Sequence, residues 1–352
     1  MSCPAAVEPP RVARPAKKVK VRRRGDRSQQ VRHAVQVAFL LLNIWIGVEF
    51  YQFVRFYESG GEGAWVERPP GVEGWLPIAS LMNLKYLVLT GRLPGAHAAG
   101  LFLLLAFALS SLLLRKAFCG WLCPVGTVSE YLWKLGRQTF GRNWSLPRWA
   151  DIPLRSVKYI LLGLFLYAIG GMSAAAIRAF LDGPYGVIAD VKMLNFFRHL
   201  SVTAAVVVGA LVLLSVFVQN FWCRFLCPYG ALMGLLAPLS PVRIRRDEDL
   251  CIDCEKCAKA CPSLLPVDRL LQVRSPECIG CYECVTVCPA RGALEMAAPR
   301  RKPVPAWAYA AALAVIFFGF VGYARWTGHW HSNIPSQVYF DLVPRASEFS
   351  HP

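Results

Sequence analysis

The sequence predicts an α-helical integral membrane protein of about five transmembrane helices, with a small α+β cysteine-rich domain inserted before the last helix. Three observations predict this fold. The 352 residues are 55% hydrophobic and only 17% charged, and the apolar residues are gathered in long stretches. A dense group of cysteines lies between the last two of these stretches. A cysteine pair also occurs twice at the ends of other stretches, which indicates an internal repeat.

Five apolar stretches are long enough to cross the roughly 30 Å hydrocarbon core of a membrane. They cover residues 34 to 54, 96 to 114, 157 to 177, 199 to 218 and 305 to 324. The first is too long for the apolar part of a signal peptide, so we expect an uncleaved anchor. The predicted organisation is a basic arm (1–33), two membrane repeats (34–144 and 145–246), the cysteine-rich domain (247–299), a fifth transmembrane helix (300–325) and a tail (326–352).

The net charge of +17 follows the expected topology. Ten lysines and arginines lie between Arg11 and Arg32, and others follow the second and fourth stretches and precede the fifth. Because cytoplasmic segments carry such an excess, we expect a bacterial inner membrane protein with a cytoplasmic N-terminus and cysteine-rich domain and a periplasmic tail. Lipid is then a partner, and nucleic acid is not, because no aromatic-basic binding motif accompanies the charge.

Residues 251 to 289 contain CIDCEKCAKACP followed by CIGCYECVTVCP. Each half fits the bacterial iron-sulfur run C-x2-C-x2-C-x3-C-P, in which the fourth cysteine binds the other cluster. The pattern therefore predicts a ferredoxin domain with two [4Fe-4S] clusters, bound by Cys251, Cys254, Cys257 and Cys288 and by Cys278, Cys281, Cys284 and Cys261. Structural zinc sites are the alternative, and a disulfide framework is disfavoured because these residues are expected in the reducing cytosol.

The remaining paired cysteines belong to the repeat. FCGWLCPVG from Phe118 matches WCRFLCPYG from Trp222, with the cysteines 104 positions apart. Each copy follows an apolar stretch at its cytoplasmic end, which predicts a parallel repeat about an axis along the membrane normal. One pair offers two thiolates on one helix face, and two pairs complete a four-ligand site. We expect Cys119, Cys123, Cys223 and Cys227 to hold a third iron-sulfur centre, [4Fe-4S] or [2Fe-2S].

Two other interpretations of these four cysteines stay open, namely a thiol-disulfide or metal-relay site and ordinary packing of buried cysteines. Gly126 and Gly230 predict a tight turn after each pair. Thr127 and Glu130 form a capping-box pattern, which predicts that a new helix begins after the first turn.

These motifs together resemble the membrane polyferredoxins of the NapH, NosR and CcoG type, as does the segment RPPGVEGWLPIASLMNLKYLVLTG at residues 68 to 91. The resemblance covers about residues 30 to 345. It implies a membrane iron-sulfur protein that passes electrons from quinol or a cytoplasmic donor toward a periplasmic reductase, or one that supports assembly of a metalloenzyme.

Three polar residues near the outer ends of the stretches are further candidates. Glu49 can take a proton from a quinol, and the alternative is an interfacial carboxylate paired with Arg55 or water. His97 and His199 begin the second and fourth stretches and, if they face each other, can ligate a haem or bracket a quinone. No residue is predicted to be catalytic.

The clusters are all expected at the cytoplasmic face, so the roughly 30 Å hydrocarbon core separates them from the outer side. A quinone pool, a haem or a partner redox subunit must bridge this gap. The first hypothesis is an electron carrier, or a subunit of a quinol dehydrogenase, linking a quinone pool or cytoplasmic donor to a partner reductase. The alternative is an accessory factor that supplies electrons for metal or cofactor reduction during assembly of a respiratory metalloenzyme.

Overall fold

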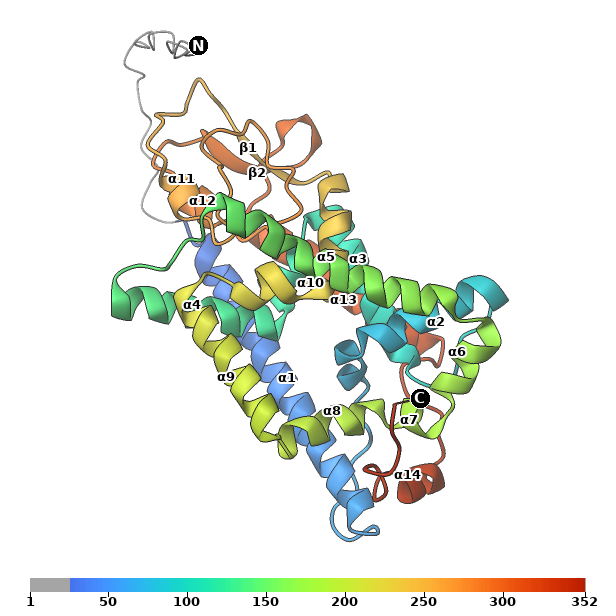
Figure 1. Ribbon diagram of the computed structural model, residues 1–352. Helices are drawn as coiled ribbons and strands as arrows, with labels where there is room; N and C mark the ends of the chain where they lie inside the picture. Colours follow the sequence, from blue (N-terminus) through green and yellow to red (C-terminus); the bar gives the residue numbers. More distant parts are fainter. Residues whose placement is uncertain (1–25, 352) are drawn as a thin grey trace, which may run out of the picture.

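The computed structural model describes residues 26 to 351, apart from the side chains of Arg148 and Arg301. Most of the predicted basic arm, residues 1 to 25, lies outside this range. The described chain is mainly helical, with a small two-stranded domain at one end (Figure 1).

The membrane part begins with α1 (Ser28–Glu58), a long helix that reaches from the cysteine-rich domain to the opposite end of the molecule (Figure 1). A short 3-10 helix, η1 (Pro70–Trp75), leads to α2 (Pro77–Thr90) and α3 (Ala98–Leu114). The other helices of this part are α4 (Pro124–Phe140), α5 (Arg148–Gly171), α6 (Ala174–Leu181), α7 (Pro184–Val187), α8 (Ala189–Arg198), α9 (Val202–Phe217), α10 (Pro228–Leu236) and α13 (Ala306–Trp326).

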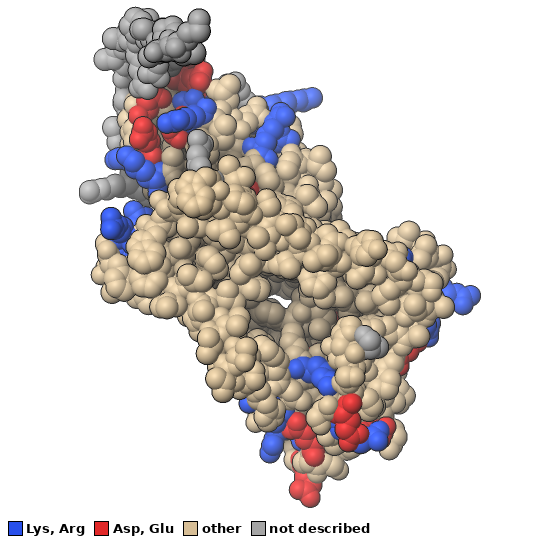
Figure 2. Space-filling model, viewed as in Figure 1, with Lys and Arg blue, Asp and Glu red and all other residues tan. Residues whose placement is uncertain are grey.

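Among the described residues, α1, α5 (from Trp149) and α13 are long and apolar enough to cross a membrane. The helices α8 and α9 together form a fourth candidate, but they meet at an angle of 84°. The second predicted span corresponds to α3, which is apolar but has only 17 residues. In Figure 2 the middle of the visible face carries very few charged residues, while lysine, arginine, aspartate and glutamate gather toward the two ends. The fold is that of a membrane protein, with three or four candidate spans rather than five clear ones.

The cysteine-rich domain has one antiparallel sheet, in which β1 (Arg243–Arg246) pairs with β2 (Leu294–Ala297). The chain between the strands contains α11 (Lys256–Lys259) and α12 (Glu283–Thr286), each of which carries a cysteine. Ile244 and Met296 are opposite each other in the sheet and are both buried in the main hydrophobic core, which continues into α3 and α13. The domain is therefore packed directly onto the membrane helices, and two 3-10 turns, η4 (Ala237–Leu239) and η5 (Pro299–Arg301), join it to them.

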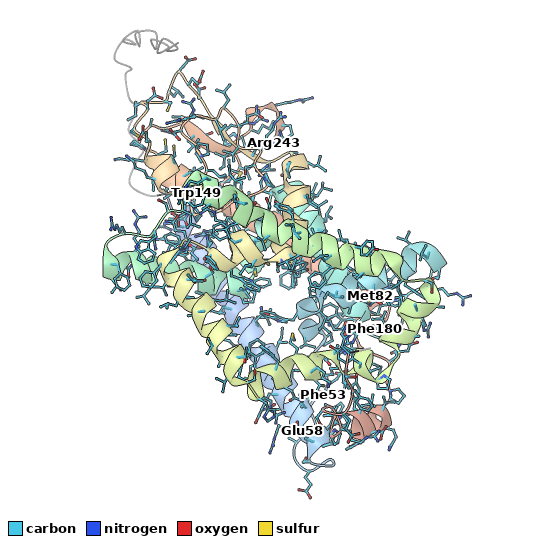
Figure 3. The ribbon with its side chains drawn as sticks, viewed as in Figure 1. Phe53, Glu58, Met82, Trp149, Phe180 and Arg243 are labelled. Carbon is cyan, nitrogen blue, oxygen red and sulfur yellow. The ribbon has the colours of Figure 1, made fainter. Side chains whose placement is uncertain are left out.

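The segment after α13 is folded against the rest of the protein. It contains α14 (Ser336–Leu342), and Tyr339, Leu342 and Val343 are buried. Tyr339 packs edge-on against Phe53 of α1, with ring centroids 5.2 Å apart. Figure 3 shows Phe53 and Glu58 near this end of the molecule, Met82 and Phe180 toward α2 and α6, and Trp149 and Arg243 toward the cysteine-rich domain.

Candidate functional site

The eight cysteines of the cysteine-rich domain divide into the two predicted groups of four. Each group lines a small cavity of about 20 Å³. We call them the outer ferredoxin set (Cys251, Cys254, Cys257, Cys288) and the inner ferredoxin set (Cys261, Cys278, Cys281, Cys284). All four cysteines of the inner set are buried, whereas Cys254 of the outer set is exposed and the other three are half-buried.

The two cysteine runs have the same backbone shape. The third and fifth residues of each run have positive φ: Asp253 and Glu255 in the first run at 53° and 57°, and Gly280 and Tyr282 in the second at 63° and 62°. Side chains other than glycine seldom adopt this conformation, and it costs about 1–3 kcal/mol for such a residue. The two loops therefore share one backbone conformation, with Gly280 free of the strain that Asp253, Glu255 and Tyr282 carry.

The four cysteines of the repeat lie together and line one cavity, and we call them the membrane set (Cys119, Cys123, Cys223, Cys227). The first cysteine of each pair lies in a π-helical turn, η2 (Phe118–Leu122) or η3 (Trp222–Leu226), and the second cysteine directly follows that turn, one residue before α4 or α10. The second cysteine of each pair is the N-cap of the new helix, and its Sγ accepts the backbone N–H of Gly126 at 3.4 Å or Gly230 at 3.2 Å. The two loops therefore have the same local structure.

The prediction of a new helix after the first turn is confirmed, but the predicted capping box does not form. The helix α4 begins at Pro124, because Cys123 caps it and proline suits a first helical position. Thr127 donates its hydroxyl hydrogen bond to Cys123 O at 3.1 Å, and Glu130 points to a different partner. That partner is the fully buried Arg32 of α1, whose Nη1 donates to Glu130 Oε2 at 2.9 Å and whose Nη2 donates to Oε1.

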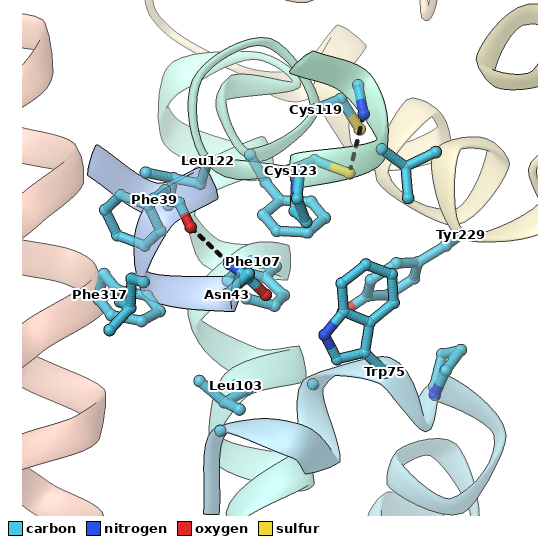
Figure 4. A pocket seen from close by; sticks show the side chains of 18 of the residues that line it. Phe39, Asn43, Trp75, Leu103, Phe107, Cys119, Leu122, Cys123, Tyr229 and Phe317 are labelled. Atoms are coloured by element: carbon cyan, nitrogen blue, oxygen red, sulfur yellow. Dashed lines mark hydrogen bonds between the residues drawn. The ribbon is translucent and has the colours of Figure 1, made fainter. Parts of the chain in front are cut away.

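The cavity beside the membrane set has a volume of about 770 Å³. Figure 4 shows Cys119 and Cys123 at one side of it, with Phe39, Phe107 and Tyr229 among the residues on its wall. Along α1 the wall runs from Phe39 to Glu49, which corresponds to about 15 Å of helix. The lining residues include the cysteines, many apolar side chains, several of them aromatic, and the charged Glu49, Arg68 and Arg325. The volume is in the size range of small-molecule sites.

Buried charges surround the membrane set. Glu277, the residue before Cys278, binds Lys158 Nζ through both oxygens at 2.6 and 2.7 Å and lies 3.9 Å from Lys116 Nζ. Lys116 and Glu277 both line the cavity. Burial raises the pKa of the Cys119 thiol to about 11, although the nearby Lys116 acts in the opposite direction. A buried thiol of this kind is deprotonated at neutral pH when it is bound to a metal centre.

The three polar candidates have different surroundings. Glu49 lies on the cavity wall, and no hydrogen bond or ion pair joins it to another residue in the range 26 to 351. His97 is buried, with Nε2 2.7 Å from Gly186 O and Nδ1 3.2 Å from Arg68 Nη2. His199 is exposed in the bend between α8 and α9. The structure does not bring His97 and His199 together, because both ring nitrogens of His97 contact other groups.

A buried ionic network, which the sequence did not predict, surrounds His97. Arg68 Nη1 donates to Glu73 Oε1 at 2.6 Å, and Arg68 Nε donates to Asp190 Oδ2 at 2.8 Å. Burial alone would raise the pKa of Glu73, but Arg68 and His97 lower it to about 2. The motif RPPGVEGW contains Arg68 and Glu73, yet its spacing gave no signal that Asp190 would complete the network.

Two protein-family descriptions match the chain. The "4Fe-4S binding domain" matches residues 96–143 and again residues 200–246, so that each match contains one pair of the membrane set. The "4Fe-4S dicluster domain" matches residues 244–296, which contain both ferredoxin sets. No solved structure matches the chain.

Three relatives place the chain among known proteins. YccM of Escherichia coli (strain K12) is 49% identical over 326 residues, which are 91% of this chain and 91% of YccM. The regulatory protein NosR of Pseudomonas aeruginosa is 33% identical over 165 residues, 46% of this chain and 22% of NosR. The ferredoxin-type protein NapH of Escherichia coli (strain K12) is 28% identical over 191 residues, 52% of this chain and 59% of NapH. The chain therefore belongs to the family of membrane polyferredoxins that includes NapH and NosR, and it is an iron-sulfur electron-transfer protein.

Proposed function

We propose that this protein transfers electrons between a quinone in the membrane and a partner redox protein, with one iron-sulfur cluster bound by each of its three cysteine sets. The two ferredoxin sets each hold a [4Fe-4S] cluster, and the membrane set holds a third cluster, [4Fe-4S] or [2Fe-2S]. The arrangement of the thiols supports this assignment, because each set supplies four cysteines to one cavity. The clusters supply one-electron redox chemistry when bound.

The observation that carries the proposal is that the membrane set and a large apolar cavity share one space. Four thiols occupy one end, and about 15 Å of α1 lines the remainder. A quinone is a flat ring with an apolar tail, and the aromatic walls around Trp75, Phe107 and Tyr229 suit it. Oxidation of a quinol to a quinone releases two electrons and two protons, and Glu49 on the same wall is the candidate proton acceptor.

We also infer the orientation in the membrane. The N-terminal arm and the ferredoxin domain face the cytoplasm of a bacterial cell, and the segment from 326 to 352 faces the periplasm, because lysine and arginine are concentrated around the first two. The matching structures of η2 and η3 support a parallel repeat of two units. With α3 and the bent pair counted, residues 26 to 351 offer helices for the five spans that we propose. The partner is then a reductase on the periplasmic side or a redox subunit at the ferredoxin end.

A bulky side chain in the cavity tests the quinone site. Val321 of α13 lines the cavity, so Val321→Trp is expected to fill part of it and to abolish reduction of the clusters by menaquinol or ubiquinol. The same substitution at Val315, which is 73% exposed on the same helix, is the matched control and is expected to leave quinol-dependent reduction intact. The measurement is cluster reduction by EPR after addition of quinol, with iron content as the check on folding.

Equal quinol-dependent reduction in Val321→Trp and Val315→Trp, at unchanged iron content, would show that this cavity is not the quinone site. Reduction of both variants by dithionite is the positive control, because a chemical reductant does not need the cavity.

A further inference from the structure

We propose that electrons pass between the membrane set and the outer ferredoxin set through the inner ferredoxin set, across a contact formed by Gly120 and Trp121. This inference rests on the proposed function, in which all three sets bind clusters. It fixes the order of the three sets and identifies two positioning residues.

The first half of the contact is between two backbones. Gly120 lies between Cys119 and Cys123 in η2, and Ile279 lies between Cys278 and Cys281 of the inner set. A Cβ atom at position 120 would be only 2.4 Å from Ile279 O, so only glycine allows the two loops to approach this closely. The backbone of the first membrane-set loop is therefore in direct contact with the inner-set backbone between Cys278 and Cys281.

The second half of the contact is a hydrogen bond. Trp121 is fully buried, and its Nε1–H donates to Gly280 O at 3.0 Å. A Cβ atom at Gly280 would be 2.3 Å from Tyr309 Oη, so this loop is also confined from the side of α13. Trp121 therefore fixes the inner ferredoxin loop against η2 at the residue next to Cys281.

The start of α1 holds both loops in place. Gln29 Nε2 donates to Cys281 O at 2.8 Å. Arg32 lies one turn further along α1 and Gln36 two turns further. Arg32 Nη1 donates to Gly120 O at 3.3 Å, and Gln36 Nε2 donates to the same oxygen at 3.2 Å. Side chains of one helix thus bind one carbonyl oxygen in the inner-set loop and one in η2. The helix α1 therefore holds the two loops at a fixed separation.

The repeat itself shows that this contact belongs to the first copy. The two copies share both cysteines, the leucine before the second cysteine, the proline and the following glycine. At the positions of Gly120 and Trp121 the second copy has Arg224 and Phe225, and Arg224 pairs with Asp151 of α5 at 2.6 Å instead. Two of the four positions at which the copies differ, 120 and 121, are therefore the ones that contact the inner set in the first copy.

The different burial of the two ferredoxin sets indicates which of them lies nearer the membrane set. The inner set is buried on the membrane side of the domain, and apolar residues such as Leu265 and Val273 line its cavity. The outer set is lined by charged residues, including Asp253 and Glu255, and its Cys254 is exposed. A one-electron transfer between neighbouring sets oxidises one and reduces the other without forming or breaking a bond, so close contact is the main requirement. The outer set is then the point of exchange with a partner at the ferredoxin end.

Two substitutions test the contact in the full-length protein. Trp121→Phe copies the second repeat and removes the hydrogen bond to Gly280 O, and Gly120→Ala forces the loops apart. Both are expected to keep the full iron content but to lose magnetic coupling between the membrane and inner sets in EPR spectra of the reduced protein. Reduction of the outer set by quinol is expected to slow as well. Gly136→Ala, whose Cβ would be 2.0 Å from Val216 O in the α4–α9 packing, is the matched control for a steric clash away from the cysteines.

The possible results separate the two proposals. Unchanged coupling and an unchanged rate in Trp121→Phe at full iron content would overturn the proposed contact while leaving the three clusters in place. A native iron content of about eight would contradict the proposed function itself, because two cubane clusters account for it. Retention of the coupling in Cys254→Ser and its loss in Cys281→Ser would support the proposed order, and the reverse would contradict it.

Discussion

Replacement of Glu130 by glutamine is expected to destabilise the protein by about 3–5 kcal/mol, because the buried Arg32 loses its closest carboxylate partner and keeps the more distant Glu283, whose Oε1 is 3.4 Å from Arg32 Nη2. Arg32 is fully buried in α1, and Glu130 is its bidentate acceptor. Gln36 and Lys134 also donate to Glu130, at 3.1 and 2.6 Å. The substitution therefore weakens the connection between α1 and α4 at the level of the cysteine loops. The apparent melting temperature in detergent measures the effect.

The same carboxylate gives a pH dependence of defined sign. Burial by itself would raise the pKa of Glu130, but His33, whose Nε2 is 3.9 Å from Glu130 Oε1, and the charge of Arg32 lower it well below its usual range. A depressed folded-state pKa contributes stability above the unfolded value of about 4.3, and this contribution is lost as the pH falls toward the folded value. Wild type is expected to lose stability below about pH 4.3, and Glu130→Gln is expected to show a shallower loss.

Glu248→Gln is the matched control for this prediction. Glu248 pairs with Arg246 at 3.0 Å, but its side chain is 50% exposed, so the expected change is below about 1 kcal/mol. Equal stability of Glu130→Gln and Glu248→Gln would show that the Arg32 network does not stabilise the fold.

Replacement of Glu277 by glutamine is the second large effect that we expect, again a loss of about 3–5 kcal/mol. Glu277 lies between Lys158, which is fully buried, and Lys116, which is 3% exposed. Without the carboxylate, both buried lysines lose the one carboxylate that pairs with them among residues 26 to 351. The loss of stability is expected to appear as a lower melting temperature. Iron is also expected to be released at a lower temperature, because Glu277 is the residue directly before Cys278, a member of the inner ferredoxin set.

A second substitution distinguishes charge from packing at this position. In Glu277→Gln with Lys158→Met the ion pair is replaced by neutral side chains, so much of the lost stability is expected to return. A double variant that is less stable than Glu277→Gln alone would mean that Lys158 stabilises the fold through contacts other than this carboxylate.

The sequence predicts which cysteines lie together better than it predicts the surroundings of those cysteines. The spacing of Cys251 to Cys288 assigns each cysteine to a group of four because three ligands lie on one tight loop and the fourth must come from the other run. The structure gathers the same two groups around separate cavities. The two Cys-x3-Cys-Pro loops, which the repeat predicts to converge, line one cavity.

The features that the sequence did not predict depend on contacts between distant segments. Glu130 fits a local capping box, but a buried arginine about 100 positions earlier binds it instead, and this tertiary contact overrides the local pattern. The cavity is lined by residues of α1, η1, α3, η2, η3 and α13. The sequence of any one of these segments does not indicate that a cavity forms between them. His97 has the appearance of a ligand at the start of an apolar stretch, yet Arg68 and Gly186 engage its ring. The sequence does contain a signal for the contact at Gly120, because the second copy of the repeat has Arg224 at the corresponding position.

The most direct test of the three-cluster account is the content of iron and acid-labile sulfide per polypeptide in the native protein and in a variant with Cys119→Ser and Cys223→Ser. With three cubane clusters we expect about twelve irons in the native protein and about eight in the variant. A native value near ten that falls to eight would indicate a two-iron centre in the membrane set. Cys3→Ser, which affects the one cysteine outside the three sets, is expected to leave the count unchanged. About eight irons in both the native protein and the double variant would contradict the third centre.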